Sequence, residues 1–227
     1  MEKLPSYVIP LGLGNEKYPN NWLVEKKGDN ISLLNKFYAE FTGLYWIWKN
    51  RINNLNDNDL IGNCHNRVLW LNDLYENKKK FTTKSLFDNF LSKENEILKK
   101  KDVIQVQPIS FKNKNLFEDF EEIHKCDALV KSLEFLDTGL SQKFAKHLEG
   151  NKLFPHNMFI TSKSFFIEYC EIIFPWLDKC FEYCDSNNLC KDYNMRLPAF
   201  LAERFTSFWF SEFKNRGFLS YARLGEL

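Results

Sequence analysis

The sequence lacks the long apolar run and the leader that mark membrane and secreted proteins. No apolar stretch reaches the length of a bilayer span, and the opening residues, MEKLPSYVIPLG, do not resemble a signal peptide. We therefore expect a cytoplasmic protein. The chain also lacks an excess of either charge. Its 31 basic and 30 acidic residues leave a net charge of +1, which argues against a general nucleic-acid binder.

Cysteine pairs and the common catalytic motifs are missing as well. The six cysteines form no CxxC pair, and their one cluster, Cys180, Cys184 and Cys190, has no histidine beside it. A zinc site needs four well-spaced ligands, so we expect reduced, buried thiols and neither disulfides nor bound zinc. No HExxH or GxSxG motif occurs. Gly12-Leu13-Gly14 is too short for a phosphate loop and is expected to be a turn.

Aromatic residues, by contrast, are abundant. The 227 residues include 22 Phe, 9 Tyr and 6 Trp, which is enough to fill a large core. Two aromatic stretches, 165–181 and 200–213, are expected to pack in that core, with a face that rests on a membrane or a partner as the alternative. The chain shows no internal repeat and no long linker, so we expect a single domain over residues 1–227.

Hydrophobic periodicity predicts strands that alternate with helices. This pattern is typical of an α/β domain with a partly parallel sheet and a helix-rich C-terminal half. A break is expected near Thr138-Gly139, and Pro175 is expected to kink or divide its helix. Strands are expected over residues 7–11, 60–64, 102–109, 157–161 and 218–224, and helices over 30–50, 82–97, 116–148, 162–184 and 198–214; residues 68–77 are ambiguous.

Residues 28–67 join a capped helix to a buried strand that ends in polar residues. Asp29 or Asn30 can accept the free backbone N–H groups of the helix's first turn. Asn35 and Glu40 lie away from the apolar stripe of this helix. Because their surroundings are so apolar, these two side chains need polar partners.

The three residues His65, Asn66 and Arg67 follow the predicted strand directly. Open α/β sheets bind ligands beyond the carboxyl ends of their strands. The guanidinium of Arg67 would suit a diphosphate there, because its fork pairs two oxygens and is always charged. Alternatively, Arg67 pairs with Asp59 or Glu40 and holds the helix on the strand, and the spacing does not choose between these interpretations.

Further candidates lie in the second half of the chain. Glu203 sits between aromatic residues, where burial would raise its pKa and suit it to act as a base. Alternatively, it forms a structural ion pair with Arg204 or Arg196. His156 and Asn157 precede a predicted strand and bring another polar pair to the edge of the sheet.

The segment Asp57-Asn58-Asp59 is formally a DxD motif, which binds a divalent cation in many nucleotide-sugar enzymes. It lies before a strand, whereas such a ligand normally lies after one. A solvated turn is the favoured interpretation. The sequence thus assigns no metal ligand and no certain cofactor, and leaves Mn²⁺ or Mg²⁺ open.

Taken in order, several sequence blocks resemble the family catalogued as domain of unknown function 4422, the capsular and exopolysaccharide synthesis glycosyltransferases. The resemblance extends over most of the chain and is far more specific than any single motif. Its blocks are GDNIS at 28–32, N(x)2YxE(x)4YWxWKN at 35–50, IGxCHxR at 61–67, NMFI at 157–160, YCE at 169–171 and FLAER at 200–204.

The resemblance implies a GT-A-like α/β fold and a hexosyltransferase-type enzyme. It implies a nucleotide-sugar donor, first of all a UDP-sugar, and as acceptor a glycan or lipid-linked glycan of the bacterial surface (capsule, exopolysaccharide or lipopolysaccharide). The expected location is the cytoplasm, with the inner face of the inner membrane as an alternative. The expected roles are base for Glu203; charge stabilisation for Arg67 and Arg204; donor binding for Asp29, Asn30, Asn35, His65 and Asn66; and acceptor or sugar binding for Glu40, His156 and Asn157.

Two departures from the family pattern support an alternative function. The family usually reads HYRRYF after the strand, whereas this chain reads HNRVLW, with Asn66 and Val68 in place of a Tyr and an Arg. Members also usually begin with an additional strand and a His-containing loop before the PLG-like segment, whereas this sequence starts almost at Tyr7-Val8-Ile9-Pro10. The alternative is a non-catalytic member that binds a glycan or serves as a scaffold in a polysaccharide-assembly complex.

Overall fold

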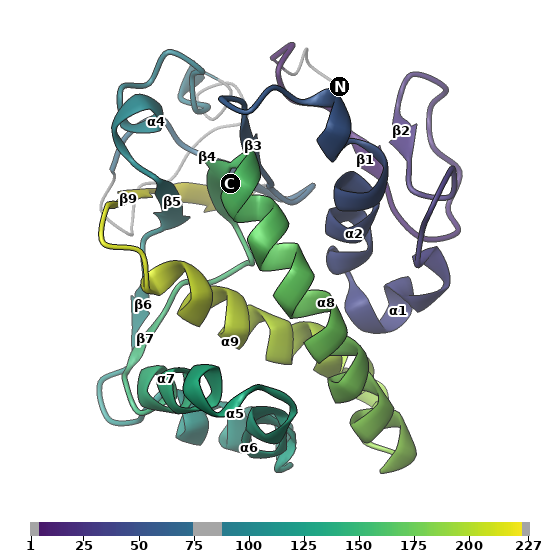
Figure 1. Cartoon of the computed structure of the whole chain (residues 1–227), viewed down its shortest axis with the longest axis vertical. Helices are drawn as coiled ribbons and strands as arrows, with labels where there is room; N and C mark the ends of the chain where they lie inside the picture. Colours follow the sequence, from purple (N-terminus) through teal and green to yellow (C-terminus); the bar gives the residue numbers. More distant parts are fainter. Residues whose placement is uncertain (1–4, 75–87, 224–227) are drawn as a thin grey trace.

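Two long aromatic helices form the centre of the molecule. In the computed structural model, which describes residues 5–74 and 88–223, α8 (Lys163–Ser186) and α9 (Leu197–Ser211) pack against each other and cross (Figure 1). The side chain of Ser162 caps the first turn of α8. The helix then continues past its internal proline without dividing.

A four-stranded sheet lies at one end of these helices. Its strand β8 is antiparallel to both of its neighbours, whereas β5 and β9 are parallel, so the sheet is partly parallel as the sequence predicts. Every residue of β5 is buried because this strand lies between two others. In order across the sheet, the strands are β3 (Leu60–Gly62), β8 (Phe159–Ser162), β5 (Val103–Val106) and β9 (Arg216–Leu219).

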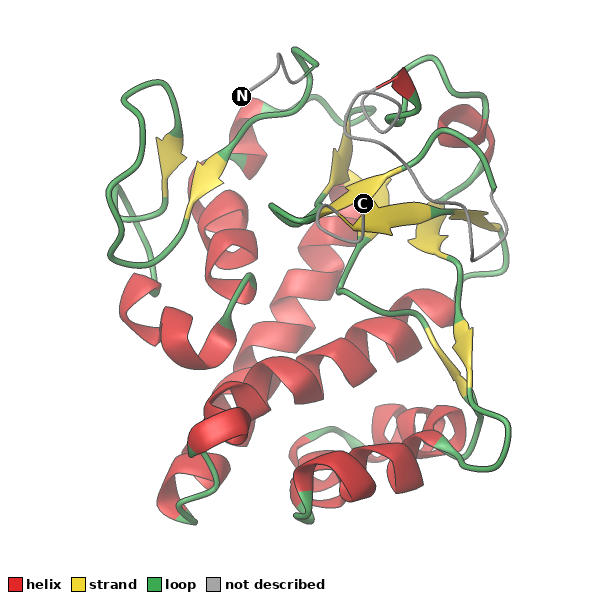
Figure 2. Ribbon diagram, turned by 180° about the vertical axis from the view of Figure 1, so that it is seen from behind, coloured by secondary structure: helices red, strands yellow, loops and turns green. Residues whose placement is uncertain are grey.

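Short two-stranded ribbons surround this sheet (Figure 2). The β4–β10 ribbon is antiparallel and places Arg223 opposite Val68. The β1–β2 ribbon is parallel, and the β6–β7 ribbon is antiparallel. The ribbons consist of β1 (Leu11–Gly12) with β2 (Leu23–Val24), β4 (Val68–Trp70) with β10 (Tyr221–Arg223), and β6 (Ile109–Ser110) with β7 (Lys152–Leu153).

Shorter helices cover both sides of the α8–α9 pair (Figure 1). On one side, next to the β1–β2 ribbon, lie α1 (Asn35–Tyr38) and α2 (Phe41–Asn50). On the other side lie α5 (Leu116–His124), α6 (Ala128–Ser132) and α7 (Thr138–Leu148). The remaining elements are α4 (Ile97–Lys100) and the 3-10 turns η1 (Ser32–Leu34), η2 (Ile52–Asn54), η3 (Leu133–Phe135) and η4 (Asp192–Arg196).

Alternate residues of the sheet contribute to two hydrophobic cores, as the period of a strand requires. Val103 and Phe159 pack into the main core with the helices, whereas Ile104 and Ile160 pack into a smaller core with the β4–β10 ribbon. Both aromatic stretches contribute heavily to the main core, which confirms the core interpretation for these side chains: Phe166, Phe174, Trp176, Phe205, Phe208 and Phe210 are all buried. Among the described residues, no helix is both long and apolar enough to cross a membrane.

The predicted helix over residues 30–50 is broken in its middle. Ala39 has φ 49° and ψ −128°, outside the helical region, and separates α1 from α2. The side chain of Asn35 donates to the carbonyl oxygen of Ala39 (2.9 Å) and to Oγ1 of Thr42 (3.0 Å). A polar side chain inside the predicted helix thus bonds to the local backbone and stabilises the break.

Other predicted elements are shorter or divided. The first strand begins only at Leu11, and the strand predicted over 102–109 is divided into β5 and β6 by Gln107-Pro108. The helix predicted over 116–148 is divided into α5, α6 and α7. The first of these, α5, is followed by Lys125, whose left-handed φ of 52° ends the helix. Residues 82–87 of the helix predicted over 82–97 lie outside the described residues, and Phe90 forms a β-bridge with Leu71, so that helix prediction was wrong over 90–96.

Candidate active site

The strand over 60–62 leads into a tight hairpin that carries the predicted phosphate-binding residues. His65 and Val68 form a β-bridge, with hydrogen bonds of 3.0 Å from His65 N to Val68 O and 3.4 Å from Val68 N to His65 O. Asn66 and Arg67 are the two residues of the turn, and both are exposed. Arg67 makes no hydrogen bond or ion pair with another described residue, so its guanidinium is available to a ligand at the tip of the hairpin.

Opposite this hairpin, two consecutive residues have a left-handed backbone. His156 has φ 71° and Asn157 has φ 52°. A non-glycine residue in a sparsely populated region costs on the order of 1–3 kcal/mol and persists only where its surroundings hold it there. Such strain concentrates at functional sites. The residues that hold this segment are therefore candidates for the functional site.

Three side chains from distant parts of the chain hold the left-handed segment. Glu203 Oε1 accepts the backbone N–H of His156 at 2.7 Å, and Asn63 Nδ2 donates to the carbonyl oxygen of Asn157 at 2.7 Å. Glu40 Oε1 accepts from Asn157 Nδ2 at 2.6 Å. Asn63 also accepts the N–H of Phe159 at 3.1 Å, so it fastens the hairpin to the start of β8.

His65 completes this group. Its Nε2 donates to the carbonyl oxygen of His156 and lies 3.8 Å from Glu40 Oε1. The side chains of His65 and Glu40 are each about one quarter exposed, at 24% and 26%. A carboxylate and an imidazole therefore meet at a surface that solvent, and hence a ligand, can reach.

A buried ion-pair network supports Glu203 from behind. Arg204 donates from Nη1 to Glu203 Oε2 at 3.2 Å and from Nη2 to Asp119 Oδ2 at 2.7 Å, and Lys114 Nζ lies 3.0 Å from Asp119 Oδ1. The side chains of Arg204 and Asp119 are each only 4% exposed. Burial raises the pKa of Glu203, and the charge of Arg204 and the N–H of His156 partly oppose that rise.

An arginine from the C-terminal strand lies at the rim of the group. Arg223 Nη2 lies 3.3 Å from Nε2 of His156. Burial, followed by the charges of Arg223 and His65, lowers the pKa of His156 to about 4, so its ring is neutral at pH 7 and Nε2 accepts the arginine's hydrogen bond. Because Arg223 pairs with Val68 in the ribbon, it lies at the same end of the ribbon as Arg67.

We call the residues that converge here the polar cluster. They come from the start of α2, the β3–β4 hairpin, the segment before β8, the first half of α9 and β10. The cluster consists of Glu40, Asn63, His65, His156, Asn157, Glu203, Arg204 and Arg223. Of the residues that the sequence suggested, the structure thus brings together Glu40, His65, His156, Asn157, Glu203 and Arg204.

Three residues predicted to bind the donor make hydrogen bonds outside the polar cluster. Asp29 accepts from Tyr45 Oη at 3.3 Å, and its N–H donates to Asn50 at 3.0 Å. Asn30 Oδ1 accepts from the N–H of Ser32 at 3.2 Å. The side-chain bonds of Asn35 remain within the α1–α2 junction. Donor binding by Asp29, Asn30 and Asn35 stays a prediction.

Sequence reasoning missed Asn63, Asp119 and Arg223. Asn63 had a signal, because it lies within the IGNCHNR block. Asp119 and Arg223 had no such signal, since their partners are remote along the chain.

The DxD segment is a solvated turn in the structure: the side chain of Asp57 is 97% exposed and lies 3.2 Å from Lys163 Nζ. Within the described ranges, no group of three or more His, Cys, Asp or Glu side chains could hold a metal.

This arrangement has the groups that proton transfer and hydroxyl binding require. Each oxygen of Glu203 accepts one hydrogen bond, Oε1 of Glu40 accepts one, and His65 lies beside Glu40. Asn157 is 4% exposed, and its Oδ1 has no hydrogen-bond partner among the described residues. A buried acceptor in that state favours a ligand that brings a hydroxyl or another N–H or O–H group.

Comparisons with known proteins identify the architecture. The family model described as "Domain of unknown function (DUF4422)" matches residues 2–215. Among solved structures, the chain is similar to the apo structure of the WbbM bifunctional glycosyltransferase, with a TM-score of 0.79 and 20% sequence identity. The match covers 98% of this chain and 43% of that one, so the chain spans less than half of its length. No curated protein matches the sequence. The likeness confirms the mixed α/β, glycosyltransferase-like fold that the sequence predicted.

Proposed function

The chain belongs to the DUF4422 family, and from this membership, its glycosyltransferase-like fold and the polar cluster we propose that it is a glycosyltransferase of the hexosyltransferase type. In this proposal a sugar moves from a nucleotide-diphosphate donor, first of all a UDP-sugar, to a glycan or lipid-linked glycan of the bacterial surface. The reaction would take place in the cytoplasm or at the inner face of the inner membrane.

The observation that carries the proposal is the convergence of the cluster on a strained segment. Glu40, Asn63 and Glu203 hold the left-handed backbone of His156 and Asn157 from three separate elements. His and Asn are among the non-glycine residues that adopt this conformation most readily, and here two consecutive ones are held by side chains from three separate elements. In this proposal the segment presents the His156 carbonyl region and the Asn157 side chain to a ligand.

Glu203 is the proposed base. Transfer to a hydroxyl requires a group that takes its proton, and a carboxylate with a raised pKa is better matched to neutral pH than an ordinary one. Glu203 is 19% exposed, and each of its oxygens accepts one hydrogen bond, which leaves a lone pair on each. Glu40, with His65 beside it, is proposed to bind a hydroxyl of the transferred sugar or of the acceptor.

The departing diphosphate needs positive charge to stabilise it. We propose that the arginines at the rim of the polar cluster supply this charge. Arg67 is exposed at the tip of the hairpin, and Arg223 lies at the same end of the ribbon. Arg204, in contrast, is buried between Glu203 and Asp119. We therefore propose that Arg204 acts through Glu203 by fixing its orientation, and that Arg67 meets the phosphates directly.

One observation favours the second candidate, a glycan-binding protein without transferase activity. The interior cation of the cluster, Arg204, is paired with two carboxylates, and the ring of His156 is neutral at pH 7. Among the described cations at this site, the exposed Arg67 and Arg223 then remain to neutralise a diphosphate, unless Mn²⁺ or Mg²⁺ arrives with the donor. Such a site would bind sugar hydroxyls well and a nucleotide diphosphate weakly.

A thermal-shift panel separates the two candidates. Nucleoside diphosphates and nucleotide sugars are added to the full chain with and without Mn²⁺, since a ligand that binds the native state raises Tm. Stabilisation by one nucleotide and one sugar supports the enzyme. No change in Tm with any nucleotide or nucleotide sugar, together with a rise in Tm with a glycan, supports the binding protein. If the enzyme is supported, Arg67→Ala must weaken donor binding in calorimetry, or the phosphate assignment is wrong.

A further inference from the structure

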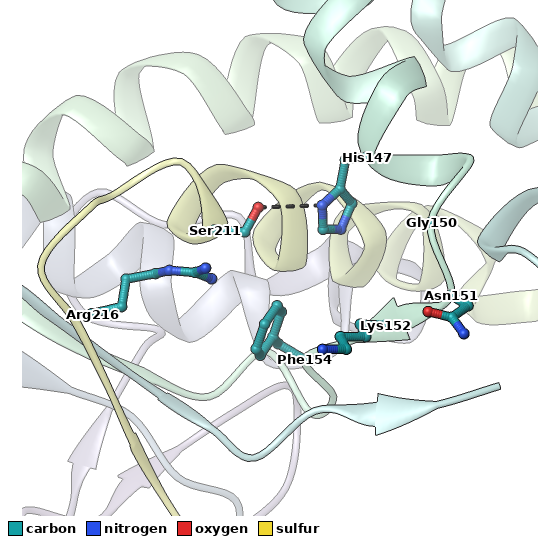
Figure 3. A pocket seen from close by; sticks show the side chains of 7 residues that line it. All are labelled: His147, Gly150, Asn151, Lys152, Phe154, Ser211 and Arg216. Atoms are coloured by element: carbon teal, nitrogen blue, oxygen red, sulfur yellow. Dashed lines mark hydrogen bonds between the residues drawn. The ribbon is translucent and has the colours of Figure 1, made fainter.

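A separate cavity lies between the end of α7, the β7 segment and the junction of α9 with β9 (Figure 3). Its volume is about 270 Å³. No residue of the polar cluster lines it. The lining residues are His147, Gly150, Asn151, Lys152, Phe154, Ser211 and Arg216.

The guanidinium of Arg216 is the most distinctive group in this cavity. It lies over the rings of Phe154 and Phe218, at 5.5 and 5.6 Å from their centroids, and the two rings stack on each other. Its Nη1 is buried and has no hydrogen-bond partner among the described residues. An arginine remains charged at any working pH, so this nitrogen is a fixed cationic donor without an acceptor.

The wall beside Arg216 is hydrogen-bonded and neutral. Ser211 Oγ donates to the carbonyl oxygen of Phe208 at 2.7 Å and lies 3.2 Å from Nδ1 of His147, while His147 Nε2 lies 3.3 Å from Ser207 Oγ. Burial, followed by the charge of Arg216, lowers the pKa of His147 to about 4. The histidine is therefore neutral at pH 7, and both ring nitrogens are engaged.

The charges around the cavity are one-sided. Lys152 also lines it and makes no ion pair with a described residue, and Figure 3 shows its side chain reaching toward Phe154. No carboxylate is among the lining residues. The nearby acid that acts on Arg216 is Glu212, which is 49% exposed and lies 3.8 Å from Lys143. The two lining cations thus face the cavity without a lining acid to neutralise them.

From these observations we propose that this cavity binds an oxyanion, either a phosphate or the carboxylate of an acidic sugar. The guanidinium of Arg216 donates to an oxygen of such a group, and Lys152 supplies a second charge. The stacked Phe154 and Phe218 rings hold the guanidinium in place before the ligand arrives, which lowers the entropic cost of binding. The site is distinct from the polar cluster, and its occupancy does not depend on whether the chain transfers a sugar.

The test is a titration of the ¹⁵N-labelled full chain followed by NMR, with inorganic phosphate, glucuronate and neutral glucose as probes. The readouts are the Arg216 Nε–H resonance and the backbone amides of residues 150–152. Phosphate, glucuronate or both should shift these resonances with roughly millimolar affinity, whereas glucose should not. A response to phosphate alone identifies free phosphate as the ligand, and a response to glucuronate alone identifies an acidic sugar.

Variants make the assignment specific. Arg216→Gln should weaken the responding anion about tenfold or more, and Lys152→Gln, at an exposed position that folding does not need, by several-fold. Lys146→Gln is the matched control, since it removes the same charge from a side chain that is 84% exposed and outside the cavity. The proposal is overturned if neither anion shifts these resonances up to tens of millimolar, or if Lys152→Gln and Lys146→Gln weaken binding equally.

Discussion

The two groups of polar residues that the sequence assigned to a single site are built in opposite ways. Around Asp29, Asn30 and Asn35, the hydrogen bonds join residues at most 21 positions apart. In the polar cluster, His156 and Glu203 are 47 positions apart, and Asn157 and Glu40 are 117 apart. The local group can form as soon as its turn and helix form, whereas the cluster exists only in the complete fold. This difference fits the proposal that the local group shapes the chain and that the cluster carries the chemistry.

Removal of Asp119 is expected to have the largest effect on stability. Asp119→Ala leaves Arg204 buried without its closest carboxylate, so the free energy of unfolding should fall by about 3–5 kcal/mol. Urea denaturation measures this loss. Glu122→Ala is the control, because Glu122 shares the partner Lys114 but is 70% exposed, and its loss should change stability by about 0.5 kcal/mol or less. Equal effects of the two variants would mean that the buried network does not hold the cluster.

A matched pair of asparagines compares the two groups directly. Asn63 fastens the hairpin to Asn157 and Phe159, and Asn50 makes a comparable pair of bonds to the backbone of Asp29. Asn63→Ala should lower the free energy of unfolding by about 1–3 kcal/mol, because it leaves partly buried backbone groups unpaired. Asn50→Ala, whose bonds to Asp29 are exposed, should cost about 1 kcal/mol or less. A larger loss for Asn50→Ala in urea denaturation would contradict the contrast between the groups.

Acid should act on the contacts of His147 with α9, whereas the local group contains no histidine that could titrate. Burial lowers the pKa of His147 to about 4, below the ordinary value of about 6.5 that applies to the unfolded chain. The unfolded chain therefore binds more protons between these pH values. The stabilising contribution of His147 is complete above about pH 6.5 and is lost as the pH falls toward about 4, by at most about 1.4 kcal/mol per pH unit.

Stability measured by urea denaturation at a series of pH values tests this expectation. His147→Gln should flatten the rise in unfolding free energy between about pH 4 and 6.5, without abolishing it, because the pKa of His156 is also lowered to about 4. An unchanged slope in the variant would show that His147 is not buried in its neutral form.

Much of the fold followed from local patterns. The aromatic helices, the strand over residues 60–64 and the strand before α8 were visible in apolar periodicity, because burial imposes that periodicity wherever an element packs. The break at Ala39 was not visible, because it depends on a side chain, Asn35, that bonds to the backbone in place of the helix. The ribbon between β4 and β10 was not visible either, since its partners are more than 150 residues apart in sequence and no local signal joins them.

For the site, the sequence indicated residue types but not their connections. His65, Glu203 and Asn157 stood out as polar residues beside apolar elements, and all three lie in the cluster. The sequence pattern singled out no role for Asp119, whose burial depends on where α9 packs. Arg223 lies near the end of the chain and became visible only through its register with Val68. Such positions cannot be predicted without the tertiary fold.

The central claim is that the long-range cluster, and not the local group, carries out sugar transfer. The most direct measurement is kcat for release of nucleoside diphosphate from the donor found by the thermal-shift panel, compared between Glu203→Gln and Asp29→Ala. We predict that Glu203→Gln lowers kcat by about 10²–10⁴-fold with donor affinity unchanged, as loss of a general base requires, and that Asp29→Ala stays within about twofold of the unmodified chain. Full activity in Glu203→Gln, or an equal loss in Asp29→Ala, would contradict the claim.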